Sequence, residues 1–191
     1  MAHRRFTREE LERFRDADVP DLVGPGVKLL FIGVNPGLWT AATATPFAHP
    51  GNRFYPALDK AGIVALPKNF ADGFSDDDRA HIMAAGIGIT NLVHRATVRA
   101  DELSREELRA GASRVAEDVA RWRPAVVAVV GITAYRTGFR RPKAVRGEQP
   151  ELLSGARLWV VPNPSGLNAH DTVASLAEAY AEPARAAGLL R

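Results

Sequence analysis

The sequence predicts a three-layer α/β/α sandwich around a mainly parallel, roughly four-stranded central sheet. Short apolar runs bounded by glycine and proline alternate with longer helical patterns, which is typical of parallel sheets covered by helices on both faces. No internal repeat or linker-like segment interrupts the 191 residues, so we expect one domain over 1–191. Hydrophobic residues make up 46% and charged residues 25%, the ordinary balance of a chain that builds its own core.

The first half of the chain is expected to contain two strands among three helices. Thr7 and Glu10 have the spacing of a capping box, which predicts a helix start. The acidic run at 76–78 suits the positive end of another helix. In order, the predicted elements are a helix after Thr7, a strand at 27–33, a loop to Pro50, a helix capped by Asn52 and ending at Lys60, a helix opened by Asp76, and a strand at 86–90.

The second half repeats the alternation of strand and helix. Ser104 and Glu107 form a second capping-box pattern, and the β-branched run at 126–130 is typical of a strand buried on both faces. In order, we expect a helix from Ser104 to Trp122, a strand at 124–131, a short helix at 132–137, a basic loop at 138–150, a strand at 157–161 ended by Pro162, and a helix from about Asp171 to Ala187.

Composition excludes several classes of protein. The chain has no cysteine, which excludes disulfides, thiolate zinc sites, iron–sulfur clusters and a cysteine nucleophile. We predict neither a metal site nor a cofactor. No apolar run approaches the length of a membrane span, and no secretion signal follows the basic N-terminus at 1–7. We therefore expect a cytoplasmic protein, associated with the nucleoid if it is bacterial. The net charge of +3 permits nucleic-acid binding without requiring it.

Three asparagines follow predicted strands directly. Asn35 follows the first strand, Asn91 the second and Asn163 the strand that ends the sheet pattern. Ligands of open parallel sheets bind beyond the carboxyl ends of the strands. The three side chains are therefore expected to converge on one crevice, although each is also an ordinary turn residue.

Two segments carry a more specific signal. The first is Gly33-Val34-Asn35-Pro36-Gly37-Leu38, which continues to Pro46-Phe47-Ala48-His49-Pro50-Gly51-Asn52-Arg53-Phe54, and the second is Val161-Pro162-Asn163-Pro164-Ser165-Gly166-Leu167-Asn168. Together with the stretch from Ile89 to Thr97, they resemble the mismatch-specific uracil-DNA glycosylases, a branch of the uracil-DNA glycosylase superfamily. The resemblance extends from about Lys28 to Tyr180.

The resemblance implies a repair enzyme that flips uracil out of a mispair with guanine and hydrolyses its glycosidic bond. Members of the family act on G·U and, in some cases, G·T mispairs. The implied roles are water positioning for Asn35, base reading for the backbone at Val34 and Asn35, base stacking for Phe47, a base contact for Asn91, phosphate binding for Ser165, loop shaping for Asn163, and a duplex wedge for Gly166 and Leu167. Phe47 also fits an ordinary core position, and Asn91 a strand-end cap.

The sequence departs from the family pattern at two places. Some relatives carry an arginine where this chain has Ala169, and Asn168 or His170 are the candidates to replace it. Some relatives have an acid where this chain has His94, to which we assign no catalytic role. Thr40 lies where relatives have small residues near C5 of the base, so its methyl group is expected to disfavour thymine.

The expected partner is double-stranded DNA containing G·U or similar mispairs, bound by a monomer without a membrane. Two other functions are compatible with the residues: an α/β domain that binds nucleotide or phosphate, and a non-catalytic module that binds distorted DNA. The usual glycine spacings of phosphate loops are missing, and no Gly-x-Ser-x-Gly elbow indicates a serine hydrolase. Release of free uracil separates the glycosylase from both alternatives.

Overall fold

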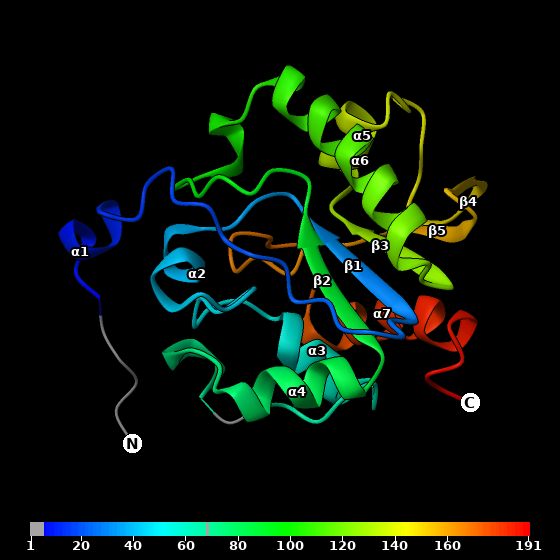
Figure 1. The fold of residues 1–191 in the computed structure, drawn as a ribbon, viewed down its shortest axis with the longest axis horizontal. Coiled ribbons are helices and arrows are strands. Elements are labelled where there is room, and N and C mark those ends of the chain that lie inside the picture. Colours follow the sequence, from blue (N-terminus) through cyan, green and yellow to red (C-terminus); the bar gives the residue numbers. More distant parts are fainter. Residues whose placement is uncertain (1–5, 68) are drawn as a thin grey trace.

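The described residues form a five-stranded sheet with helices on both faces, as Figure 1 shows. The computed structural model describes residues 6–67 and 69–191, so most of the basic N-terminus lies outside the described part. The strand order is β2-β1-β3-β5-β4. The strands are β1 (Leu29–Gly33), β2 (Ile87–Asn91), β3 (Val126–Val130), β4 (Gly147–Leu153) and β5 (Ala156–Val161).

Four of the strands run in the same direction. β1 pairs with both β2 and β3, β3 pairs with β5, and only β4 is antiparallel to its neighbour. The carboxyl ends of β1, β2, β3 and β5 therefore meet at one edge of the sheet. Within this pairing Gly33 lies opposite Asn91, so the chain leaves β1 and β2 at the same level.

The helices agree closely with the predicted pattern. Both expected capping boxes are present, at Thr7 with Glu10 and at Ser104 with Glu107, and Ser75 forms another with Asp78. The helices are α1 (Arg8–Glu12), α2 (Leu38–Thr43), α3 (Phe54–Lys60), α4 (Asp76–Ala84), α5 (Arg105–Trp122), α6 (Ile132–Gly138) and α7 (Val173–Ala186), with short 3₁₀ turns at Phe70–Asp72 and Ala100–Glu102. None of the helices in the described ranges is both long and apolar enough to cross a membrane.

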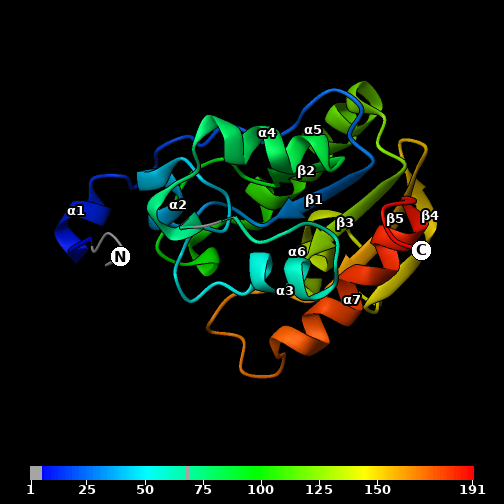
Figure 2. The same cartoon turned by 90° about the horizontal axis from the view of Figure 1, so that it is seen from below.

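Alternate residues of β1, β3 and β5 are buried in two separate cores, one on each face of the sheet. Phe31 and Ala128 pack with α3, α4 and α7 on one face, where Tyr180 and Phe54 are large members. Ile32 and the other alternating residues pack with α5 and α6 on the opposite face. In Figure 2, α3, α4 and α7 lie on the near side of the sheet, and the loop before α7 protrudes from the body.

The prediction of a loop over 138–150 was wrong at its end, because residues from Gly147 belong to β4. This strand forms a hairpin with β5 through Ser154 and Gly155, which both have positive φ. β4 lies at the edge of the sheet, where only one side is paired and a proline such as Pro150 is tolerated. Its polar composition hid it from a search for apolar runs.

The loop expected between Gly37 and Pro50 was also partly wrong, since it contains the helix α2. Leu38 and Thr40 are buried on that helix, which ends where Ala44 adopts a left-handed conformation. Six residues are too few for hydrophobic periodicity to show in the sequence. The helix predicted after Asn52 is α3, and the Asn52 side chain accepts a hydrogen bond from the Phe54 amide at 2.9 Å.

Helix α5 contacts the chain directly after β2 at very short range. A Cβ atom built on Gly111 would lie 1.9 Å from the carbonyl oxygen of Leu92. One turn further along, an Arg114 guanidinium nitrogen donates to the carbonyl oxygen of Asn91 at 2.5 Å. The helix therefore fixes the backbone at the carboxyl end of β2.

Replacing Gly111 with alanine is expected to destabilise the protein. Alanine is favoured over glycine in a helix by about 1 kcal/mol, but here the added methyl group must push α5 away from Leu92. We expect a net loss of about 2 kcal/mol, within the usual cost of overpacking, measured as a lower urea midpoint. Ser113→Ala, on the exposed side of α5, is the control and should change stability by less than about 0.5 kcal/mol. Equal stability of Gly111→Ala and the wild type would contradict the close contact.

Candidate active site

A cleft of about 1090 Å³ lies where the parallel strands end. Residues that follow β1, β2 and β5 contribute to its walls, together with α2 and the turn before α3. All nine site residues predicted from the sequence line this cleft: Val34, Asn35, Thr40, Phe47, Asn91, Asn163, Ser165, Gly166 and Leu167. The expected convergence of the three asparagines on one crevice is therefore confirmed, whereas their roles stay predictions.

The side-chain amide of Asn35 is held in one orientation. Its nitrogen lies 3.1 Å from the carbonyl oxygens of Pro36 and of Arg95 and 2.7 Å from the hydroxyl of Thr97, and since it carries two hydrogens, one of them is shared between two of these acceptors. All three partners accept, so rotating the amide by half a turn would place its oxygen against acceptors. Within the described residues no donor engages Asn35 Oδ1, which leaves this oxygen as the amide's acceptor in the cleft.

Thr97 determines the polarity of this arrangement. Its hydroxyl donates its single hydrogen to the carbonyl oxygen of Arg99 at 2.7 Å, and therefore presents a lone pair to Asn35. Thr97 is 1% exposed, and its backbone forms a bridge with Gly37. The segment after β2 thus orients the amide that follows β1.

Phe47 forms an aromatic wall of the cleft. Its ring stacks on Phe54 with centroids 4.1 Å apart and planes inclined by 24°. The backbone of Phe47 has a φ of 54°, a left-handed conformation that is unusual for a bulky residue and often marks a functional site. Phe54 belongs to the core, so the exposed face of Phe47 is backed by a rigid support.

Two further polar residues complete the inner part of the cleft. Asn91 is 9% exposed and Thr40 is 6% exposed, so both are nearly removed from solvent. Asn91 is held through its backbone by Arg114. Phe47 lines the cleft and also packs against the core, and Asn91, the last residue of β2, lines the cleft as well.

The β5–α7 loop, residues 162–172, forms the outer wall of the cleft. Asn163 Oδ1 accepts the Ser165 amide at 2.9 Å, and the Ser165 hydroxyl accepts the Leu167 amide at 3.3 Å. These side chains satisfy the backbone of a loop that has no regular structure. Leu167 is 90% exposed, so an apolar side chain stands in solvent at the mouth of the cleft.

The side chain of Asn168 forms hydrogen bonds within this loop. Its amide nitrogen donates to the carbonyl oxygen of Asn163 at 2.9 Å and to the carboxylate of Asp171 at 2.8 Å. Burial alone would raise the pKa of Asp171, but the hydrogen bond from Asn168 and the charge of Arg146 outweigh it and lower this pKa. Asn168 is therefore occupied in the loop and is a poor replacement for the arginine absent at Ala169.

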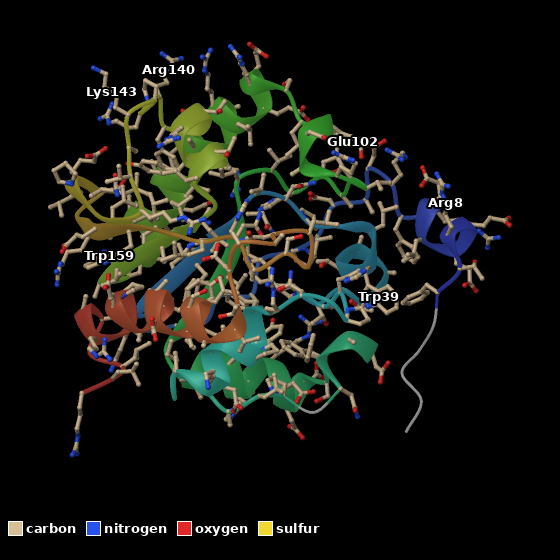
Figure 3. All side chains as sticks on the ribbon, turned by 180° about the vertical axis from the view of Figure 1, so that it is seen from behind. Arg8, Trp39, Glu102, Arg140, Lys143 and Trp159 are labelled. Atoms are coloured by element: carbon tan, nitrogen blue, oxygen red, sulfur yellow. The ribbon has the colours of Figure 1, made fainter. Side chains whose placement is uncertain are left out.

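Several charged residues lie away from the cleft. His94 pairs with Asp21, with Nε2 and Oδ1 3.0 Å apart, and is absent from the cleft lining. Arg140 and Lys143 of the basic segment lie far from the cleft residues Arg8 and Trp39 in Figure 3. Arg140 and Lys143 therefore do not line the cleft, whereas Arg146 of the same segment pairs with Asp171 in the β5–α7 loop.

Three residues in or beside this site were not predicted from the sequence. Thr97 lies 62 positions from Asn35, and no spacing rule connects them. His49 and Arg53 belong to the first motif segment, but the sequence does not indicate which residues their side chains contact. His49 Nδ1 accepts the Gly51 amide at 3.0 Å, and its ring meets the edge of Trp39 at 5.7 Å.

A metal ion has no evident set of ligands here. Within residues 6–67 and 69–191, no group of three or more histidine, cysteine, aspartate or glutamate side chains is arranged to hold one. Asparagine amides, hydroxyl groups and aromatic rings line the cleft together with aliphatic side chains and the charged side chains of Arg8, Glu12, Arg99 and Asp101. The amides and hydroxyls can orient a neutral molecule by hydrogen bonds.

The sequence matches a known protein family. The family model described as the uracil DNA glycosylase superfamily matches residues 20–183. This range contains both motif segments and all five strands.

The pKa of the His49 ring is expected to lie below that of an ordinary histidine. Burial lowers the pKa of His49, and protonation of Nδ1 would also break its bond to the Gly51 amide. The neutral ring is therefore favoured in the folded protein. Its contribution to stability is present above the ordinary pKa of about 6.5 and is lost as the pH falls through the lowered value.

NMR titration of the ring protons of His49 measures this directly. The urea-unfolded chain supplies the reference, because His49 has no fixed environment there. A pKa in the folded protein equal to or above that of the unfolded chain would contradict the geometry at this turn.

Proposed function

Because the chain belongs to the uracil DNA glycosylase superfamily, we propose that it is a monofunctional uracil-DNA glycosylase that removes uracil mispaired with guanine in duplex DNA. The observation that carries the proposal is the fixed amide of Asn35, whose nitrogen faces three acceptors and whose oxygen is left available in the cleft that Phe47 also lines. We propose that it acts as a monomer.

The reaction replaces the bond between N1 of uracil and C1′ of the sugar with a bond to water. In this mechanism the glycosidic bond breaks first, leaving an oxocarbenium-like sugar and a uracil anion. Asn35 Oδ1 accepts a hydrogen bond from a water molecule and directs its oxygen at C1′. The amide is not basic enough to remove a proton, so the water adds to the cation and its proton is released to the uracil anion or to solvent.

The base is held by groups of different chemistry. Phe47 stacks on the flipped base, the backbone at Val34 and Asn35 reads its edge, and the Asn91 amide donates to an oxygen of the leaving anion. Dipoles that are already oriented stabilise developing charge without reorganisation. The methyl group of Thr40 crowds the position of a thymine methyl, which favours uracil.

The duplex is opened at the outer wall of the cleft. A base inside the stack is out of reach, so the nucleotide must rotate out, at a cost that is lower for a mispair. Leu167 stands exposed at this wall, and an apolar side chain of this kind fills the gap left between the neighbouring bases. Ser165 binds a backbone phosphate, which positions the duplex.

The deciding experiment compares four substrates of identical sequence: duplexes with G·U, A·U or G·T, and single-stranded DNA with uracil. Detection of abasic sites and of free base reports hydrolysis. We expect the highest rate with G·U and little release of thymine. Binding to the G·U duplex without release of any base would favour the non-catalytic DNA-binding module instead.

Asn35→Ala is expected to slow uracil release by about 10²-fold or more, the effect of losing a positioned catalytic group. The substitution removes the oxygen that holds water but leaves Leu167 and the phosphate contacts in place. Single-turnover rates on the G·U duplex and binding to an uncleavable analogue measure the two effects. Binding should change little, and a nearly normal rate would show that Asn35 does not hold the water.

Thr97 provides a matched test of the same amide. Thr97→Ser keeps the hydroxyl that fixes the Asn35 orientation, whereas Thr97→Val keeps the shape without it. The valine variant should therefore release uracil more slowly than the serine variant. Equal rates in the two variants would mean that the orientation of Asn35 does not depend on this hydroxyl.

Leu167→Ala is expected to slow release from the duplex much more than release from single strands. If filling the stack contributes about 1.4 kcal/mol, the duplex rate falls about tenfold, while a single strand has no stack to fill. The measurement is the ratio of mutant to wild-type rate on the two substrates. Equal ratios would indicate that Leu167 supports the fold or the cleft in general.

A further inference from the structure

The side chain of Arg53 reaches into the β5–α7 loop from the residue that precedes α3. Its guanidinium donates to the carbonyl oxygens of Ser165 at 2.5 Å and Asn168 at 2.6 Å, and also to that of Asp171. The Arg53 backbone amide donates to the Pro164 oxygen at 3.0 Å. One residue thus holds four carbonyl groups of a loop that has no regular structure.

These contacts form a closely packed junction. Nε of Arg53 is buried and has no partner among the described residues, so the group is fixed by the fit of its two terminal nitrogens. A Cβ atom on Gly166 would lie 2.8 Å from the Gly51 oxygen, so the loop also touches the turn at residues 49–53 backbone to backbone. Tyr180 holds the start of the loop through the Pro162 oxygen at 2.9 Å.

Arg53 also lies next to the support of the aromatic wall. Phe54, the following residue, is the ring on which Phe47 stacks at 4.1 Å. The contacts that connect Phe47 with the loop therefore pass through Arg53 and Phe54, two adjacent residues at the start of α3. A shift of this loop relative to Phe47 requires that the Arg53 hydrogen bonds break.

We propose that Arg53 is a positioning residue that fixes Leu167 at a set distance from the base-stacking wall, so that opening the duplex and seating the base occur together. This inference rests on the proposed function, since it assigns Leu167 to the duplex and Phe47 to the base. Lysine keeps the charge but has one nitrogen in place of a planar fork. It cannot hold the Ser165, Asn168 and Asp171 oxygens in the arginine geometry.

Hydrogen exchange provides a test that does not depend on catalysis. The amides of Ser165, Leu167 and Asn168 are protected by bonds within the loop. Arg53→Lys should speed their exchange by about tenfold or more, while the strands β1 and β3 exchange as before. Arg136→Lys is the matched control, because Arg136 also binds a loop carbonyl, that of Ala144 at 2.7 and 2.9 Å, in the segment away from the cleft.

A double-mutant cycle tests whether Arg53 acts through Leu167. Arg53→Lys should lower the single-turnover rate on the G·U duplex by about tenfold, the scale of loss from misplacing a positioning group. In a Leu167→Ala background the same change should alter the rate by less than about twofold, because the side chain that Arg53 positions is gone. Arg53→Gln, which keeps two donors without the charge, replaces the lysine variant if that variant fails to fold.

The outcomes separate the inference from the proposed function. Unchanged exchange in the loop of the folded variant overturns the role of Arg53, and so does an equal rate loss with and without Leu167. A wild-type protein that releases no uracil from any substrate overturns the proposed function, while the exchange data still decide whether Arg53 holds the loop.

Discussion

Parallel pairing of β1, β2, β3 and β5 is the constraint on which the rest of the molecule depends. It places the carboxyl ends of four strands at one edge, and the pairing of Gly33 with Asn91 sets two of the exits side by side. Because parallel strands need long crossovers, the segments that connect the strands carry the helices α2 to α6, and α7 follows the last strand. The cleft is the space that remains where these strands end.

The cleft is built mainly by side chains that bond to backbone. Thr97 and two carbonyl groups orient Asn35. In the β5–α7 loop, the side chains of Asn163 and Ser165 accept backbone amides, and Arg53 donates to backbone carbonyl groups. The backbone of this loop is not stabilised by the regular hydrogen bonds of a strand or a helix. Its own polar side chains supply the missing partners, which is why the site contains so many asparagines and hydroxyls.

The site also contains backbone strain that the core balances. A left-handed conformation costs a residue such as Phe47 about 1 kcal/mol or more, and its stacking on Phe54 contributes an energy of similar size. Phe54 in turn meets Phe31 of β1 edge-on, with centroids 5.0 Å apart. The aromatic wall of the cleft is therefore continuous with the core on one face of the sheet.

The sequence by itself determined the parallel sheet and the capped helices, because apolar periodicity and capping boxes are local signals. Its two motif segments, through the family that they resemble, predicted nine of the residues that line the cleft. It did not reveal β4, whose polar composition is possible only at an edge, or α2, which is too short to show a period. The contacts of Thr97 with Asn35 and of Arg53 with the β5–α7 loop were decided by the tertiary structure alone. These partners lie 62 and more than 100 residues apart in the chain, and only the packing of the crossovers against the sheet brings them within hydrogen-bond distance.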